Sequence, residues 1–114
     1  MAGSTVQRNA GSTVALSVTS TAHSAVLIDD NTNDQINYTS FLNLGSYPIA
    51  IRWGTQDPGA PTFPTDGTNG DFVLPSGMTS AMILATPTTP YYLTAKSNNA
   101  SASLLYVTPA ADQS

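Results

Sequence analysis

Only 9% of the 114 residues are Asp, Glu, Lys or Arg, whereas about 25% is usual for a soluble domain. A chain of this length encloses one modest core, which argues against several domains. The formal net charge of −4 argues against nucleic-acid binding, because that affinity comes mainly from Lys and Arg side chains on phosphates.

The sequence carries no recognisable targeting signal. Its first residues lack the basic head and apolar stretch of a secretory signal, and no run approaches the roughly 20 apolar residues of a membrane helix. It contains no cysteine, which excludes disulfides and thiolate metal sites and fits a reducing compartment. We therefore expect assembly in the cytoplasm, without a membrane partner.

Apolar and polar residues alternate with a period of two through most of the chain, which predicts β-strands. The clearest alternation, in residues 48–53, places Ile49, Ile51 and Trp53 inward. In residues 36–44, the even-numbered side chains fall on one face and the odd-numbered ones on the other. The expected strands are residues 13–18, 22–28, 36–44, 48–53, 71–74, 80–85, 91–96 and 102–108.

No helical periodicity of useful length competes with these strands, and turn residues separate them. We expect an all-β fold, an antiparallel β-sandwich or jelly roll of about eight short strands, in which the last four strands form two hairpins. The expected organisation is a flexible N-terminal arm at 1–12, a single sandwich domain at 13–109 and a C-terminal tail at 110–114.

Residues 54–70 form a long stretch without periodicity, where prolines and glycines disfavour regular structure. Loops longer than about 12 to 15 residues are uncommon in compact domains and are usually functional or disordered. Phe63 lies in this loop between Pro61 and Pro64, whose stiff backbone would hold an exposed aromatic ring as an anchor for a partner. By contrast, Tyr106 shares a strand face with aliphatic residues, which predicts that it lies in the core.

The residues that could carry out catalysis are few. His23 is the only histidine, and without cysteine a nucleophilic pair would depend on this one residue. The acidic residues are all aspartates, and they cluster in turns, in the long loop or in the tail rather than on facing elements of a cleft. We expect no catalytic residue and no enzymatic activity, and a small hydrolase is the least favoured function.

The segment DDNTND, residues 29–34, offers oxygen ligands at alternate positions, as a calcium loop does. It departs from the EF-hand pattern, since Asp34 occupies the place of the sharp-turn glycine and Ser40 that of the bidentate glutamate. Residues 65–71 have a similar composition, which a tight turn explains without a metal. We expect no metal and no cofactor.

Four segments carry a resemblance to a known group of proteins. They are residues 41–55 (FLNLGSYPIAIRWGT), 72–77 (FVLPSG), 91–95 (YYLTA) and 102–108 (ASLLYVT). In this pattern, which spans residues 36–109, the chain resembles the small all-β structural proteins of tailed bacteriophage virions. The pattern contains no catalytic or metal motif.

The resemblance implies a non-enzymatic capsid decoration (cement) protein, or another accessory head or tail component, located in the virion. Its partner would be the major capsid protein, which it would bind and stabilise, and repeated contacts on a symmetric shell favour a homotrimer. The arm at 1–12 and the loop at 54–70 would supply the contacts. We expect partner-binding side chains at Val6, Arg8, Phe63, Asp66 and Asn69.

A second class of protein shares these features. A carbohydrate- or receptor-binding β-sandwich module, from a tail fibre or a secreted lectin, would also combine low charge with polar and aromatic loops. Such a module requires Phe63, Asp66 and Asn69 to converge in one concave site, which the sequence alone does not determine.

Overall fold

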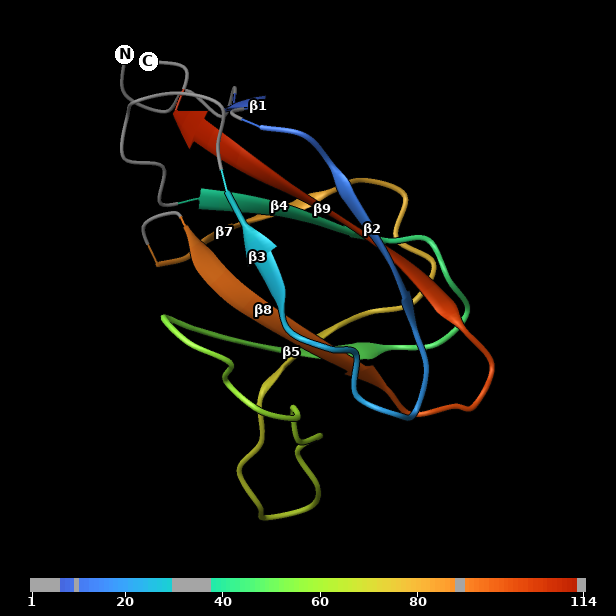
Figure 1. Ribbon diagram of the computed structural model, residues 1–114. Helices are drawn as coiled ribbons and strands as arrows, with labels where there is room; N and C mark the ends of the chain where they lie inside the picture. The colour runs from blue at the N-terminus through green and yellow to red at the C-terminus, as the bar shows by residue number, and fades with distance from the viewer. Residues whose placement is uncertain (1–6, 10, 30–37, 88–89, 113–114) are drawn as a thin grey trace.

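The computed structural model describes residues 7–9, 11–29, 38–87 and 90–112, and these ranges contain nine strands (Figure 1). No helix long and apolar enough to span a membrane occurs within them. The strands are β1 (Gln7–Asn9), β2 (Val14–Val18), β3 (Val26–Ile28), β4 (Tyr38–Asn43), β5 (Ile49–Gly54), β6 (Phe72–Leu74), β7 (Met82–Ala85), β8 (Tyr91–Ser97) and β9 (Ser103–Asp112).

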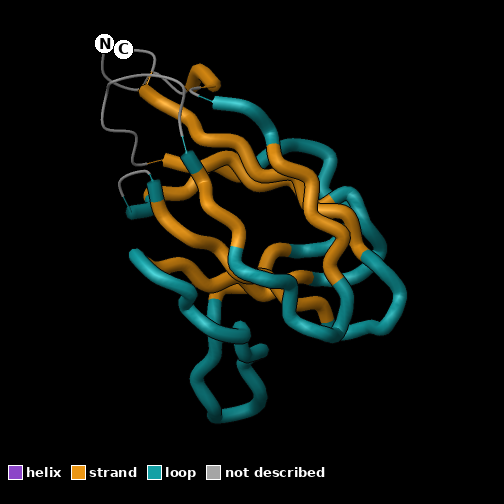
Figure 2. Tube along the Cα trace, viewed as in Figure 1, coloured by secondary structure: helices purple, strands orange, loops and turns teal. Residues whose placement is uncertain are grey.

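The strands form two antiparallel sheets, which we call sheet A and sheet B (Figure 2). In sheet A, β9 lies between β4 and the two N-terminal strands β1 and β2, and β7 forms the far edge beyond β4. Sheet B has the order β3-β8-β5-β6. The orders β2-β9-β4-β7 and β3-β8-β5-β6 are those of a jelly roll, so the expected all-β sandwich is confirmed.

The expectation of two hairpins among the last four strands is wrong. β6 pairs with β5 and β7 pairs with β4, while β8 and β9 belong to opposite sheets. The turn after β6 contains Gly77, whose φ of 61° suits glycine, and it carries the chain from sheet B to sheet A. Turn residues mark where a strand ends, but they do not determine which sheet the chain enters next.

The odd-numbered face of β4 points into the core. Phe41 is completely buried there between Thr39 and Asn43, which are also buried, whereas Leu44 just beyond the strand is 53% exposed. The register between β4 and β9 pairs Tyr106 with the outward Leu42, so the expectation that Tyr106 lies in the core is wrong. In β9 the inward side chains are the odd-numbered ones, which alternation alone does not reveal because both faces are apolar.

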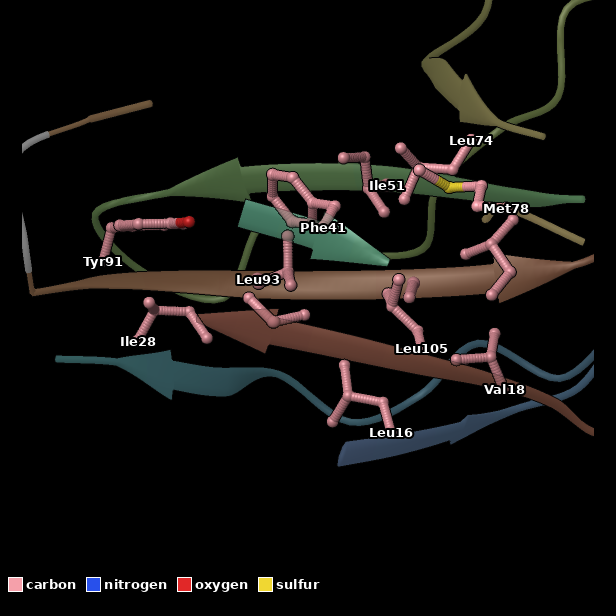
Figure 3. Packing of buried hydrophobic residues seen from close by; sticks show 13 residues of the cluster. Leu16, Val18, Ile28, Phe41, Ile51, Leu74, Met78, Tyr91, Leu93 and Leu105 are labelled. Carbon is pink, nitrogen blue, oxygen red and sulfur yellow. The ribbon is translucent and has the colours of Figure 1, made fainter. Parts of the chain in front are cut away.

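The core lies between the sheets, and its side chains point toward one another in Figure 3. Trp53 of sheet B stacks on Phe41 of sheet A, with ring centroids 6.3 Å apart and planes 18° from parallel. Trp53 also meets Tyr91 edge to face at 6.4 Å. The buried apolar cluster comprises Leu16, Val18, Ile28, Phe41, Ile49, Ile51, Leu74, Met78, Tyr91, Leu93, Ala95, Leu105 and Val107.

Buried polar groups close both ends of this core. At one end the Thr39 hydroxyl lies 2.6 Å from the Tyr91 hydroxyl and 2.9 Å from that of Thr86. At the other end Asn43 Nδ2 donates hydrogen bonds to the carbonyl oxygens of Tyr47 and Pro75, at 2.8 and 3.0 Å. These bonds satisfy groups that would otherwise be costly to bury.

The described ends of the chain extend sheet A. Gln7–Asn9, expected within a flexible arm, pair as β1 with the last three residues of β9, and β9 continues to Asp112, past the expected domain boundary at 109. β1 and β2 lie along the same side of β9, and the break between them falls opposite Pro109, which has no N–H to donate.

Candidate functional site: a braced loop on sheet B

The loop between β5 and β6, residues 55–71, is the most distinctive feature outside the sandwich. Its second half, residues 62–71, projects away from the two sheets, as Figures 1 and 2 show below β5. We call residues 62–71 the finger. The loop covers the part of sheet B beside β5 before the finger leaves the body of the protein.

A charged clasp holds the base of the finger. Arg52 on β5 donates from Nη2 to Asp71 Oδ2 at 2.8 Å and from Nε to both carboxylate oxygens at 3.2 Å. The guanidinium therefore grips the carboxylate through two nitrogens, which fixes orientation as well as distance. Arg52 Nη1 also donates to the Pro58 carbonyl oxygen at 3.3 Å, so one side chain ties both halves of the loop to the sheet.

The two legs of the finger are joined by hydrogen bonds. The Asp71 amide donates to the Thr62 carbonyl oxygen at 2.7 Å, and the Thr62 amide donates to Asp71 Oδ2 at 2.6 Å. Nearer the tip, Thr65 and Thr68 form a β-bridge around a tight turn in which Gly67 has a φ of 73°. The finger is a small hairpin with a defined shape.

The first half of the loop has its own anchor. The Thr94 hydroxyl on β8 donates to the Gly59 carbonyl oxygen at 2.6 Å, and Pro61 is buried. The Asp57 carboxylate accepts the Gly59 amide at 2.9 Å, closing a local turn. Two strands of sheet B, β5 and β8, thus hold the loop through the hydrogen bonds of Arg52 and Thr94.

The clasp shifts the titration of both its members. Hydrogen bonding to Arg52 lowers the pKa of Asp71, and the Thr62 amide acts in the same direction against partial desolvation. The hydrogen bond to Asp71 raises the pKa of Arg52. Because the side chains are 36% and 21% exposed, solvent screens this pair, and its effect is mainly to position the finger.

Three of the five expected partner-binding residues lie on the finger. Phe63 is half-buried on one leg, so the expectation of an exposed ring is wrong, whereas Asp66 and Asn69 are exposed at and beside the tip. Arg8 lies in β1 on sheet A, apart from the finger in the strand order, and Val6 lies outside the described residues.

Sequence reasoning missed three residues of this site. From the sequence, Arg52 and Asp71 were placed only within the expected strands 48–53 and 71–74, although their opposite charges flank the loop at its two ends. Phe72, which follows the clasp, is 47% exposed and adds a second aromatic ring at the base of the finger. Phe72 lies in β6, an edge strand, where the alternation of apolar and polar residues does not predict which side chains are exposed.

Within the described residues, no three His or Asp side chains gather closely enough to hold a metal ion, and no pocket opens on their surface. His23 Nδ1 lies 2.8 Å from the Ser24 carbonyl oxygen, next to it in the chain. Most of the possible calcium segment, residues 29–34, falls outside the described ranges.

Comparison of the chain with protein-family models, with curated proteins and with solved structures gives no match. The geometry of the finger and of the two sheets is therefore the basis for assigning a function.

Proposed function

We propose that the chain is a non-enzymatic structural protein of a tailed-phage virion, which binds the major capsid protein as a homotrimer and stabilises the shell. Assembly would take place in the host cytoplasm. The observation that carries the proposal is the braced finger, which presents Phe63, Asp66 and Asn69 on one projection of defined shape.

Preorganisation is what makes the finger suited to binding. A loop that is already ordered loses little conformational entropy when it meets a partner, so more of its contact energy appears as affinity. Hydrogen bonds from Arg52 and Thr94 supply that order from the sheet beneath. An aromatic ring with polar neighbours is a common composition for an interface anchor.

The low charge of the chain supports the same function. Uncharged, hydroxyl-rich surfaces can form many modest contacts without the desolvation cost of burying ions. On a shell that repeats the same site, three linked copies raise one another's effective concentration, so modest contacts are sufficient.

Co-sedimentation with empty shells of the phage that encodes the chain tests this proposal. We expect the wild-type protein to pellet with the shells, and Phe63→Ala to weaken binding by about tenfold or more, as loss of an interface anchor does. Leu27→Ala is the matched control, because Leu27 is exposed on β3, which forms the opposite edge of sheet B from β6 and lies away from the finger. Wild-type protein that stays in the supernatant, or equal binding by the Phe63 variant, would contradict the proposal.

A carbohydrate-binding module is the second candidate, because an aromatic ring, a carboxylate and an amide lie on the same finger. A glycan array probed with wild-type protein and with Asp66→Ala separates the two functions. Glycan binding that depends on Asp66, without binding to shells, would replace the capsid proposal.

A further inference from the structure

The finger, which projects from the two sheets in Figure 1, contains an asparagine followed directly by a glycine. Asn69 and Gly70 are both exposed, and no other asparagine in the sequence precedes a glycine. They lie between the β-bridge near the tip and the hydrogen bond from the Asp71 amide to the Thr62 carbonyl oxygen. Residues 69 and 70 therefore occupy the stretch of this leg between its two connections to the other leg.

The amide groups of these two residues are free to react. In the part of the chain that the structure describes, neither the Asn69 side chain nor the Gly70 amide has a hydrogen-bond partner. Across the finger from Gly70 lies Pro64, which has no N–H to donate. A Cβ on Gly70 would overlap the backbone of Pro64, so the close approach of the two legs requires glycine. The same lack of a side chain leaves the Gly70 nitrogen unobstructed.

We infer that Asn69–Gly70 is a site of spontaneous covalent modification, at which the asparagine side chain becomes a carboxylate. The Gly70 nitrogen attacks Asn69 Cγ and forms a new C–N bond. The bond from Cγ to Nδ2 breaks, and ammonia leaves with the proton of the Gly70 amide. Water then opens the resulting succinimide ring at one of its two carbonyl carbons. The reaction consumes water alone and involves no change in oxidation state.

The products would change the finger in two ways. Ring opening at Cγ gives aspartate, which adds one negative charge to a finger that already carries Asp66 and Asp71, in a chain of formal charge −4. Opening at the backbone carbonyl gives isoaspartate, which routes the main chain through Cβ and lengthens this leg by one atom. Because Gly70 packs closely on Pro64, the longer leg should lose its register with the other leg.

This modification would regulate the proposed capsid contact, and in that respect it rests on the proposed function. Asn69 lies on the surface assigned to the partner, where a new carboxylate has to be desolvated without an opposite charge to pair with. Free protein would therefore lose binding capacity with time. A bound copy, whose finger is covered, would keep its asparagine.

Peptide mapping after incubation of the folded protein at mildly alkaline pH tests the chemistry. Trypsin cuts after Arg52 and Lys96, and peptide 53–96 contains Asn69 as its one asparagine. We expect this peptide to gain about 1 Da, the difference between the ammonia lost and the water gained. The gain should be about tenfold or more faster than at exposed Asn98, which precedes another asparagine instead of glycine.

Asn69→Gln is the matched control, because the extra methylene disfavours closure of the ring while the amide is kept. A wild-type protein in which Asn69 gains mass no faster than Asn98 would overturn the inference. An equal gain of mass by peptide 53–96 of Asn69→Gln would overturn it too, since fragment ions would then assign the reaction to Gln56.

The modification and the capsid function fail in distinguishable ways. The gain of mass is measured without shells, so a chain that ignores shells would contradict the capsid function and leave the modification site standing. Where the wild-type protein binds shells, Asn69→Asp, which carries the side chain of one product, should bind about tenfold more weakly. Shell binding by Asn69→Asp equal to that of the wild-type protein would overturn the regulation of the contact.

Discussion

Ser103 donates its hydroxyl hydrogen to Asn43 Oδ1 at 2.8 Å, across 60 positions of sequence and with both side chains completely buried. The same oxygen accepts the Gly45 amide at 3.0 Å, while Nδ2 donates to two carbonyl oxygens. One amide group thereby makes all four hydrogen bonds open to it. It links the start of β9 to the end of β4, to the loop after β4 and to the turn after β6.

Removing the Asn43 amide should therefore be costly. We expect Asn43→Ala to lower the free energy of unfolding by about 2–4 kcal/mol, since several buried partners lose their bonds together. Urea denaturation followed by tryptophan fluorescence measures the change. Asn98→Ala, at an exposed position, is the control and should change stability little. If Asn43→Ala lowered the free energy of unfolding by no more than Asn98→Ala does, the hydrogen bonds of Asn43 would contribute nothing to stability.

Tyr91 should make the protein sensitive to alkali. Burial raises its pKa above the ordinary value of 10.0, although hydrogen bonds to Thr39 and Thr86 oppose the shift. In the unfolded chain this tyrosine ionises near pH 10.0 while in the folded protein it stays protonated, so its contribution to stability is complete below pH 10.0 and declines above it. Tyr91→Phe should lose about 1 kcal/mol at neutral pH. The free energy of unfolding, measured at pH values on either side of 10.0, should fall more steeply with rising pH for the wild-type protein than for Tyr91→Phe.

The clasp should respond to acid. Because hydrogen bonding lowers the pKa of Asp71, its contribution is present above the ordinary value of 3.8 and is lost as the pH falls below that value toward the lower folded pKa. Asp71→Asn should loosen the finger above pH 3.8, where the wild-type carboxylate is ionised, and cost about 1 kcal/mol or less, since the pair is partly exposed. Amide hydrogen exchange at Thr62 and Asp71 reports the change. Exchange in wild type that is unaltered through this acid range would count against the clasp.

Gly70 should be irreplaceable in the finger. A Cβ at this position would overlap the backbone of Pro64, so Gly70→Ala must separate the two legs. We expect weaker shell binding with an unchanged melting temperature, because the finger lies outside the core. Thr68→Ala, two positions earlier and exposed, is the steric control for shape. Shell binding by Gly70→Ala equal to wild type would show that the shape of the finger does not matter.

Alternation of side chains predicted most strands, because burial of one face imposes a period of two on the residues that form it. It predicted β2 and β5 well, where only one face is apolar. It failed for β9, in which Leu104 and Tyr106 face solvent while Leu105 and Val107 face the core. Where both faces are apolar, periodicity does not indicate which one is inward.

Pairing between strands could not be predicted from the same pattern. The choice between a hairpin and a crossover depends on which surface each strand buries, and Pro75 and Gly77 are compatible with either path. The site was predicted in part, since prolines around Phe63 indicated an ordered loop. The clasp was missed because Arg52 and Asp71 are 19 positions apart and their meeting depends on the fold of the loop between them.

The position of β9 has a consequence for synthesis. The last strand of the jelly roll lies in the interior of sheet A, between β4 and β2, so that sheet cannot close until β9 has left the ribosome. Until then, β2 and β4 expose edges that β9 will later cover, and these edges can pair with other chains. We expect folding to be slow for the size of the chain, because its ladders join distant segments. Each newly made molecule would then pass through a brief interval that favours capture by chaperones.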